Sequence, residues 1–225
     1  GGTYHTDKED GSDTPRDPAA PHYAPGTRYG YWDDAVNVSG IVWTRITRTS
    51  AYSFFRSRIS DPIGIPADKF SWPTEWVVDG IEQPNYAGGV EITARECARI
   101  GHLFLNRGNW DGRQLISKSW LDVATTNQVP ASLHESYYSA ADCRGMHGYH
   151  WWLNGTRPSG RRTFPDVPYD LFFTVGTGHN MLFVIPEWDM VIVRLGTDFP
   201  PPTVEQRLSF WNTVLAMIGE SFTAL

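Results

Sequence analysis

The 225-residue sequence has little basic charge: its formal net charge is −6, and no run of Lys or Arg is longer than a pair. A nucleic-acid-binding surface normally carries a basic stripe that neutralises phosphates, so no nucleic-acid partner is expected. No apolar run reaches bilayer-spanning length, so no membrane association is expected either. The chain opens on GGTYHTDKEDG, which lacks the pattern of a signal peptide and is typical of the interior of a protein. The sequence does not identify the cellular compartment.

Several catalytic and metal-binding motifs are also missing. The sequence has no Gly-x-Ser-x-Gly, no His-Glu-x-x-His, no Gly-x-x-x-x-Gly-Lys and no dinucleotide fingerprint. Cys143, His147 and His150 lie within eight residues and are potential zinc ligands, but a tetrahedral site needs a fourth. Ordinary turn and strand positions are the favoured interpretation, and no metal is expected. Whether Cys97 and Cys143 pair is left open.

Aromatic residues, by contrast, are abundant, with ten Trp, ten Tyr and eleven Phe. Large rings bury much apolar surface, and they also line pockets for small organic ligands. Most are expected in the core. One alternative is an aromatic-rich ligand-binding module, with carbohydrate as a candidate ligand, which predicts several rings exposed on one face. The candidate stacking platforms are Trp32, Trp72, Trp76, Trp110, Trp151 and Trp152.

The first two thirds of the chain predict a loop followed by a mainly helical region. Residues 1–30 are rich in Asp, Pro, Gly and Thr and predict an extended loop. Residues 65–90 predict irregular structure. A helix is predicted from Asp33, with Ala35, Val38, Val42 and Ile46 on one face, and a second over 51–59. A third follows the capping box Thr93–Glu96 and is predicted to bury Ala94, Cys97, Ala98, Gly101, Phe104 and Leu105, and a fourth begins at the capping residue Ser117.

The last third of the chain changes character, because short apolar runs alternate with Gly, Pro and Asp. Strands are predicted at 149–153, 171–175, 181–185 and 190–195, the last two as a hairpin. A second capping box, Thr203–Gln206, starts a helix that buries Leu208, Trp211, Leu215, Ile218 and Phe222. The predicted organisation is a loop over 1–30, a helical subdomain over 31–145, and antiparallel strands with a C-terminal helix over 146–225. This is an α+β arrangement.

Two segments carry more specific patterns, and five others match the same family in order. The first two are Pro25-Gly26-Thr27-Arg28-Tyr29-Gly30-Tyr31-Trp32-Asp33 and Thr174-Val175-Gly176-Thr177-Gly178-His179-Asn180. The others are Asp61–Gly64, Gly88-Gly89 with Thr93–Glu96, Gly108–Gly112, Gly148–Trp152 and Val184–Glu187. Over about residues 25–222 the sequence resembles the class C β-lactamases, DD-peptidases and related esterases and amide hydrolases, and most of all the esterase-like branch.

The resemblance implies a β-lactamase/transpeptidase-like fold that is incomplete: a helical subdomain plus an antiparallel sheet covered by the C-terminal helix. It implies acyl transfer from a small-molecule substrate to water through a serine ester, with no cofactor. Tyr31 matches the family's catalytic tyrosine, which moves protons to and from the serine and the leaving group. The backbone of Gly176 and Thr177 matches the strand that holds the oxyanion. The alternative for Tyr31 is a packed ring beside a helix start.

Three departures from the family pattern bear on the substrate. Asp33 stands where the family has Asn, so an amide donor is lost. Only the glycine of the family's Lys-Thr-Gly is retained, at Gly176, which argues for an ester or small amide rather than penicillin or peptidoglycan. His179 lies just beyond this glycine and is a candidate substrate contact, although a structural role is more common for such a histidine.

The family's nucleophile is the serine of Ser-x-x-Lys, and this sequence does not contain the motif. The residues three positions before Lys8, Lys69 and Lys118 are His5, Pro66 and Leu115. Three explanations are open: the chain is a fragment of a complete enzyme, which is the favoured one; a separate polypeptide carries the serine; or the protein is a non-catalytic relative. In the first two, a missing N-terminal segment is the partner that completes the site.

Overall fold

The computed structural model describes residues 24, 26–31, 33–134, 142–197 and 203–223, which belong to two compact units. The first unit comprises the described residues up to Ile100 with His134 and Asp142, and the second comprises Gly101–Leu133 with the described residues from Cys143 onward. Within the described ranges, every helix is too short or too polar to cross a membrane.

Among its described residues, the first unit contains two complete α-helices, one π-helical turn, short antiparallel strand pairs and the beginning of a third α-helix. The elements are α1 (Asp33–Thr47), α2 (Ala51–Phe55), η1 (Arg56–Ser60), η2 (Ala67–Lys69), β1 (Phe70–Ser71), β2 (Thr74–Val78), β3 (Ile81–Pro84) and β4 (Glu91–Ile92). The segment 51–59, predicted as one helix, is therefore an α-helix that continues as a π-helix. β1 pairs with β4, and β2 pairs with β3.

The predicted irregular structure over residues 65–90 is wrong for two parts of that range. β2 and β3 form a hairpin in which Val78 faces Ile81, and β1 pairs with β4 just beyond the range. The hairpin turns at Asp79 and Gly80, whose φ angles are 49° and 80°. Asp-Gly is a common pair in such tight turns because both residues tolerate positive φ.

Helix α1 begins where predicted, but it buries a different face. Ile41 and Thr44 are 7% and 0% exposed, whereas Val42 and Ile46 from the predicted apolar stripe are 51% and 76% exposed. Beside the apolar Ile41, the buried face carries hydrogen bonds to β3 and to the residues after it, described below. An exposed apolar stripe remains on the other face of the helix.

Helix α3 (Ala94–Leu105) follows the capping box, in which the Thr93 hydroxyl donates to the Glu96 carboxylate. Of the positions predicted to be buried, Gly101 is buried, Ala94 is exposed, and the four others are half-buried. Leu103, which the pattern did not select, is 0% exposed.

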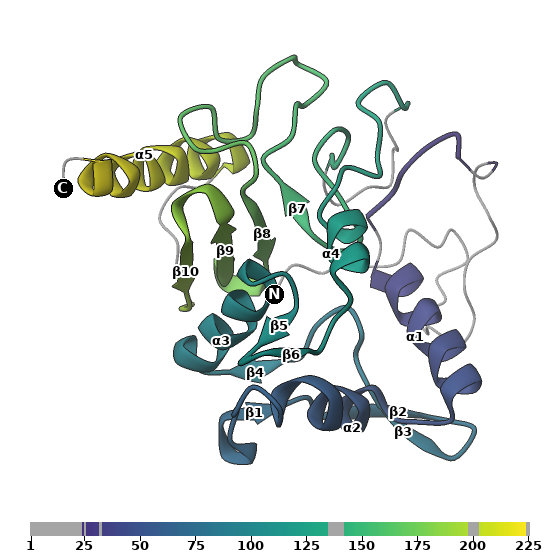
Figure 1. Cartoon of the computed structure of the whole chain (residues 1–225). Coiled ribbons are helices and arrows are strands. Elements are labelled where there is room, and N and C mark those ends of the chain that lie inside the picture. The colour runs from purple at the N-terminus through teal and green to yellow at the C-terminus, as the bar shows by residue number, and fades with distance from the viewer. Residues whose placement is uncertain (1–23, 25, 32, 135–141, 198–202, 224–225) are drawn as a thin grey trace. The chain divides into compact units, whose positions relative to one another are not determined.

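The second unit is built on a four-stranded antiparallel sheet in the order β10-β9-β8-β7 (Figure 1). The strands are β7 (Trp152–Leu153), β8 (Phe172–Val175), β9 (Met181–Ile185) and β10 (Met190–Arg194). Three of the four predicted strands are confirmed to within a residue, and the predicted strand 149–153 is reduced to its last two residues. The predicted hairpin is confirmed, with Met190 opposite Ile185. The unit also holds the β5–β6 pair (Asn109–Trp110, Arg113–Gln114), α4 (Lys118–Ala124) and α5 (Val204–Thr223).

Alternate residues of the strands face opposite layers. On one face Phe173, Phe183 and Ile185 form the core with Trp211 and Leu215 of α5. The end of α3 covers the other face at Gly101, where a Cβ atom would lie 2.6 Å from Val191 and 2.8 Å from Leu182. The α+β class and the covering C-terminal helix are therefore confirmed. Of the residues predicted to be buried in that helix, Trp211 and Leu215 are buried, Leu208 and Ile218 are half-buried, and Phe222 is 60% exposed.

The core of the second unit also contains a fully buried amide. Asn154 is 0% exposed, and its Nδ2 donates to Phe164 O at 2.9 Å and Pro168 O at 2.9 Å, while its Oδ1 accepts from Phe164 N at 2.7 Å. This side chain fixes the long connection between β7 and β8. Because buried polar groups must be satisfied, the connection depends on it.

Candidate functional site

Tyr31 lies directly before α1 in the first unit. Its side chain is half-buried, and the helix begins two residues later at Asp33, which is also half-buried. A carboxylate at the first turn of a helix is favoured by the helix dipole. Before Tyr31 the chain turns at Gly26, whose φ is 78°, and Thr27 Oγ1 donates to Ala24 O at 2.7 Å. Trp32 lies outside the described residues.

Helix α1 is held in place by a polar cluster on its buried face. Asn37 Oδ1 accepts from Tyr86 N at 2.9 Å, Tyr86 Oη lies 3.0 Å from Thr44 Oγ1, and Tyr86 Oη donates to Gln83 Oε1 at 2.7 Å. The ring of Tyr86 lies so close to Gly40 that a Cβ there would approach it to 2.2 Å. Burial raises the pKa of Tyr86, against an opposing hydrogen bond from Thr44. The cluster therefore fixes the helix whose first turn follows Tyr31.

In the second unit, Gly176 and Thr177 form the turn between β8 and β9. Gly176 N donates to Asn180 O at 2.8 Å, and His179 N donates to Gly176 O at 3.0 Å. Among the described residues, the hydrogen bonds of this turn do not use the N–H of Thr177. Gly176 and Thr177 are both exposed. The turn thus presents a backbone donor that its own folding does not consume.

Two side chains to which the sequence assigned no role organise this turn. Arg194, at the end of β10, donates from Nη1 to the carbonyl oxygens of Gly178, His179 (3.0 Å) and Gly196 (3.1 Å). Asn180 donates to Thr177 O at 2.9 Å and accepts from Gly196 N at 2.8 Å. In the sequence, Arg194 is a single cation at the end of an apolar strand. This pattern does not reveal a contact with residues 15 positions earlier.

The turn has a cationic electrostatic environment. Loss of contact with water lowers the pKa of His179, and the charges of Arg207 and Arg194 lower it further. These effects favour the neutral form of the His179 ring. Its backbone has φ 59°, a left-handed conformation that the Arg194 hydrogen bonds help to hold.

One edge of β8 is open beside the turn. β7 pairs with β8 only through Trp152–Phe173 and Leu153–Phe172. Within the described part of the chain, Thr174 and Val175 therefore have a strand partner on the β9 side alone. At Gly176 a Cβ would meet nothing closer than Asn180 O at 3.6 Å, an ordinary contact. The folding of the second unit therefore does not require glycine at 176.

The predicted site residues are divided between the two units. Tyr31 and Asp33 belong to the first, and Gly176, Thr177 and His179 to the second. That the tyrosine loop and the glycine strand line the same pocket stays a prediction.

The histidines of the 143–150 segment have structural surroundings. His147 is 3% exposed and its ring lies edge-on to that of Trp152, with centroids 5.4 Å apart. Burial lowers the pKa of His147 to about 4, with a smaller contribution from the nearby His150. Within the described ranges, His, Cys, Asp and Glu side chains form no group of three that could hold a metal.

The Trp side chains that the binding-module hypothesis uses as stacking platforms are buried or half-buried where the structure describes them. Trp151 is 8% exposed and packs against Phe104 and Phe172, with ring centroids 4.6 Å and 4.9 Å away. The other described members of that set, Trp72, Trp76, Trp110 and Trp152, are half-buried. The binding-module hypothesis predicted several of these rings to be exposed, so the burial counts against it.

Comparisons with known proteins give one consistent result. The family model described as Beta-lactamase matches residues 4–211. A 6-aminohexanoate-dimer hydrolase of Paenarthrobacter ureafaciens is 22% identical over 138 residues, 61% of this chain and 32% of that protein. A solved structure of a Bacillus anthracis protein, which is named after 6-aminohexanoate-dimer hydrolases, matches with a TM-score of 0.63 and 22% identity. The match covers 92% of this chain and 47% of the Bacillus chain.

A penicillin-binding protein homologue from Caulobacter crescentus also matches, with a TM-score of 0.55 and 17% identity over 77% of this chain and 54% of its own. At these identities the solved structures show the fold. The chain spans between a third and about half of the length of these three proteins.

Proposed function

The chain belongs to the beta-lactamase family of serine hydrolases, and on that premise we propose that it supplies the tyrosine loop and the oxyanion-binding turn of an enzyme that cleaves a small ester or amide. The serine of the acyl-enzyme intermediate comes from outside residues 1–225, because the sequence has no Ser-x-x-Lys. The chain by itself is therefore inactive.

The observation that carries the proposal is the turn after β8. Acyl transfer develops negative charge on the carbonyl oxygen, and backbone N–H groups fixed in advance stabilise that charge. The Thr177 N–H is not used by the turn's own hydrogen bonds, and Arg194 and Asn180 bind the carbonyl groups around it. The open edge of β8 and the absence of a side chain at Gly176 leave room for a substrate beside this donor.

Tyr31 is proposed as the acid and base of the reaction. In this mechanism the phenol oxygen of Tyr31 takes the proton of the serine hydroxyl while the serine oxygen attacks the substrate carbonyl. It then gives the proton to the leaving group as the bond breaks, and a water molecule reverses the sequence to release the acid. The hydrogen-bonded attachment of α1 through Asn37 and Tyr86 holds the segment that follows Tyr31.

The substrate is proposed to be an ester or a small amide rather than a penicillin. Thr174 and Val175 stand where the family has Lys and Thr, so the usual contacts with a substrate carboxylate are missing. Asp33 replaces an amide donor with an acceptor. Two of the similar proteins are named as hydrolases of a 6-aminohexanoate dimer, which is a small molecule. Their names agree with a substrate of this class.

The missing N-terminal segment is proposed to pair with β10. This strand lies at the edge of the sheet, and its residues Met190–Arg194 are all half-exposed. An apolar edge strand of this length is a template for pairing with another strand. The exposed stripe of Val42 and Ile46 on α1 is a second surface that further chain would cover. A fragment of a longer enzyme remains the favoured explanation.

Two matched pairs of variants test the roles in the complete protein that contains this chain, with p-nitrophenyl butyrate as substrate. Tyr31→Phe should lower kcat by about 100-fold or more, whereas Tyr29→Phe should change it little. Thr177→Pro removes the N–H and should cost about 100-fold in kcat, whereas Thr177→Ala keeps it and should retain activity. Equal activity within either pair would contradict the assigned role.

A further inference from the structure

A cavity of about 460 Å³ lies within the second unit, at the end of β8 opposite the Gly176 turn. Phe172 is one of its lining residues; Gly176 is four residues further along the strand, roughly 13 Å away at the rise of an extended chain. The cavity is therefore separate from the turn proposed to hold the oxyanion. Its size falls within the range of small-molecule sites.

Most of the cavity wall is apolar. Phe104 and Phe172 supply two aromatic surfaces whose ring centroids are 6.5 Å apart. The other apolar lining residues are Leu105, Leu121, Leu153, Leu171 and Pro186. Such a lining favours an organic molecule over an inorganic ion.

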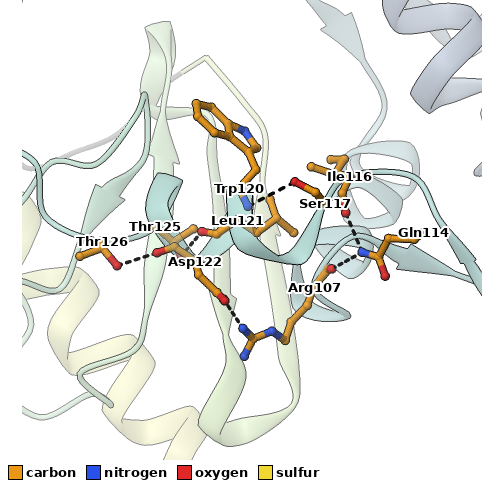
Figure 2. Close-up of polar contacts among 9 residues, drawn as sticks. All are labelled: Arg107, Gln114, Ile116, Ser117, Trp120, Leu121, Asp122, Thr125 and Thr126. Carbon is orange, nitrogen blue, oxygen red and sulfur yellow. Dashed lines mark hydrogen bonds and ion pairs between the residues drawn. The ribbon is translucent and has the colours of Figure 1, made fainter.

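The polar part of the wall is held by local hydrogen bonds, as Figure 2 shows. Arg107 forms an ion pair with Asp122 on α4, and Gln114 Nε2 fixes the Arg107 carbonyl by donating to it at 2.7 Å. Thr125 Oγ1 donates to Leu121 O at 2.8 Å, and Thr126 Oγ1 donates to Asp122 O at 2.6 Å, so the end of α4 is capped by its own side chains (Figure 2). The charge of Asp122 is thus balanced.

Asp170 is the carboxylate in the wall whose charge is not balanced. Its Oδ2 accepts from Glu187 N at 2.9 Å, and no Lys, Arg or His among the described residues forms an ion pair with it. Loss of contact with water raises its pKa. The charged lining residues are Arg107, Asp122 and Asp170, so the cavity carries a net charge of one negative unit.

We propose that this cavity is a second ligand site, which binds a small organic cation: an ammonium group against Asp170 and an apolar body against Phe104 and Phe172. The ammonium supplies the charge that the wall lacks, and the hydrocarbon fills the apolar part. This site acts independently of the hydrolytic reaction, so its test needs no nucleophile.

Isothermal titration calorimetry of the 225-residue chain with 4-phenylbutylamine tests the site, with 4-phenylbutanol as the neutral analogue of equal length. The amine should bind about fivefold more tightly than the alcohol, the size of effect expected for a partly exposed charge pair. Asp170→Asn keeps the acceptor for Glu187 N and should abolish this preference. Asp189→Asn makes the same charge change outside the cavity and should preserve it.

Leu105→Trp provides a second variant, because the larger ring occupies the cavity and should remove binding of both compounds. Equal binding of the amine and the alcohol to the unaltered chain would overturn the proposal. So would binding of neither compound at millimolar concentration, unaltered binding to Leu105→Trp, or an equal loss in Asp189→Asn and Asp170→Asn.

Discussion

Arg194 Nη1 donates to the carbonyl oxygen of His179 at 3.0 Å, which joins the end of β10 to the turn that follows β8. The same guanidinium binds the carbonyls of Gly178 and Gly196. A planar group with five donors can hold several carbonyl oxygens at once, and a lysine ammonium cannot reproduce that geometry. The donor proposed for the oxyanion, Thr177 N–H, lies in the segment that this contact fixes.

Replacement of Arg194 should therefore loosen the turn without unfolding the sheet. In Arg194→Gln, amide hydrogen exchange over residues 177–180 should become about tenfold faster or more, because charge-assisted bonds to carbonyls are lost. Exchange in β9 beyond the turn should change little. Hydrogen-exchange mass spectrometry of this chain measures both, with the exposed Arg161→Gln as control; equal effects of the two variants would contradict the role of Arg194.

Gly40 should resist even the smallest side chain. Alanine is the better helix former by about 1 kcal/mol, so propensity alone predicts that Gly40→Ala stabilises α1. The Tyr86 ring, tied by its hydroxyl to Thr44 and Gln83, leaves no room for the Cβ, so the variant should lose about 1–3 kcal/mol. Urea unfolding of Gly40→Ala and of the unaltered chain measures whether the free energy of unfolding rises or falls. Gly88→Ala, where the space is open, should change stability little.

Asn154 should be among the most sensitive polar residues of the second unit. Asn154→Ala leaves the carbonyls of Phe164 and Pro168 and the Phe164 N–H without their side-chain partner, which should cost about 2–4 kcal/mol. Asn106→Ala, at an exposed position, is the matched control and should cost less than about 1 kcal/mol. Denaturant midpoints compare the two. A loss in Asn154→Ala as small as in the control would show that the connection from β7 to β8 does not depend on this amide.

His147 should make stability depend on pH. The unfolded chain protonates this histidine near pH 6.5, whereas burial lowers the native pKa to about 4. Between these values the unfolded state binds more protons, so stability falls as the pH is lowered from 6.5 to about 4, by roughly 3 kcal/mol in full. Below pH 4 this group adds no further loss.

Urea unfolding at pH 7 and pH 4.5 tests this dependence by comparing the unaltered chain with His147→Gln. The variant should lose less stability on acidification than the unaltered chain. His102→Gln, at an exposed position on α3, is the control variant. Parallel curves for the unaltered chain and His147→Gln would rule out the assigned cause.

The elements that the sequence predicted well are those set by local chemistry. Ser117 Oγ accepts from Trp120 N at 3.3 Å, and the Thr203–Gln206 box forms its reciprocal hydrogen bonds at 3.3 Å. The β9–β10 hairpin follows from two apolar runs separated by a turn. Caps and hairpins involve residues close in sequence, so the pattern alone contains the information.

Long-range polar contacts were not predictable in the same way. The buried face of α1 carries the contact of Asn37 with Tyr86, 49 residues away, which an apolar periodicity cannot reveal. The part played by Arg194 depends on how far its side chain reaches across a sheet. At the candidate site, the sequence indicated Gly176 and Thr177 through family resemblance, but not the side chains that hold their turn.

Labelling with a fluorophosphonate probe, which forms a covalent bond with activated serines, tests the central claim most directly. The 225-residue chain should remain unlabelled under conditions in which the complete protein is labelled, and peptide mapping should place the adduct on a serine outside residues 1–225. Stoichiometric labelling of a serine within this chain would contradict the account, because it would put the nucleophile where none is assigned.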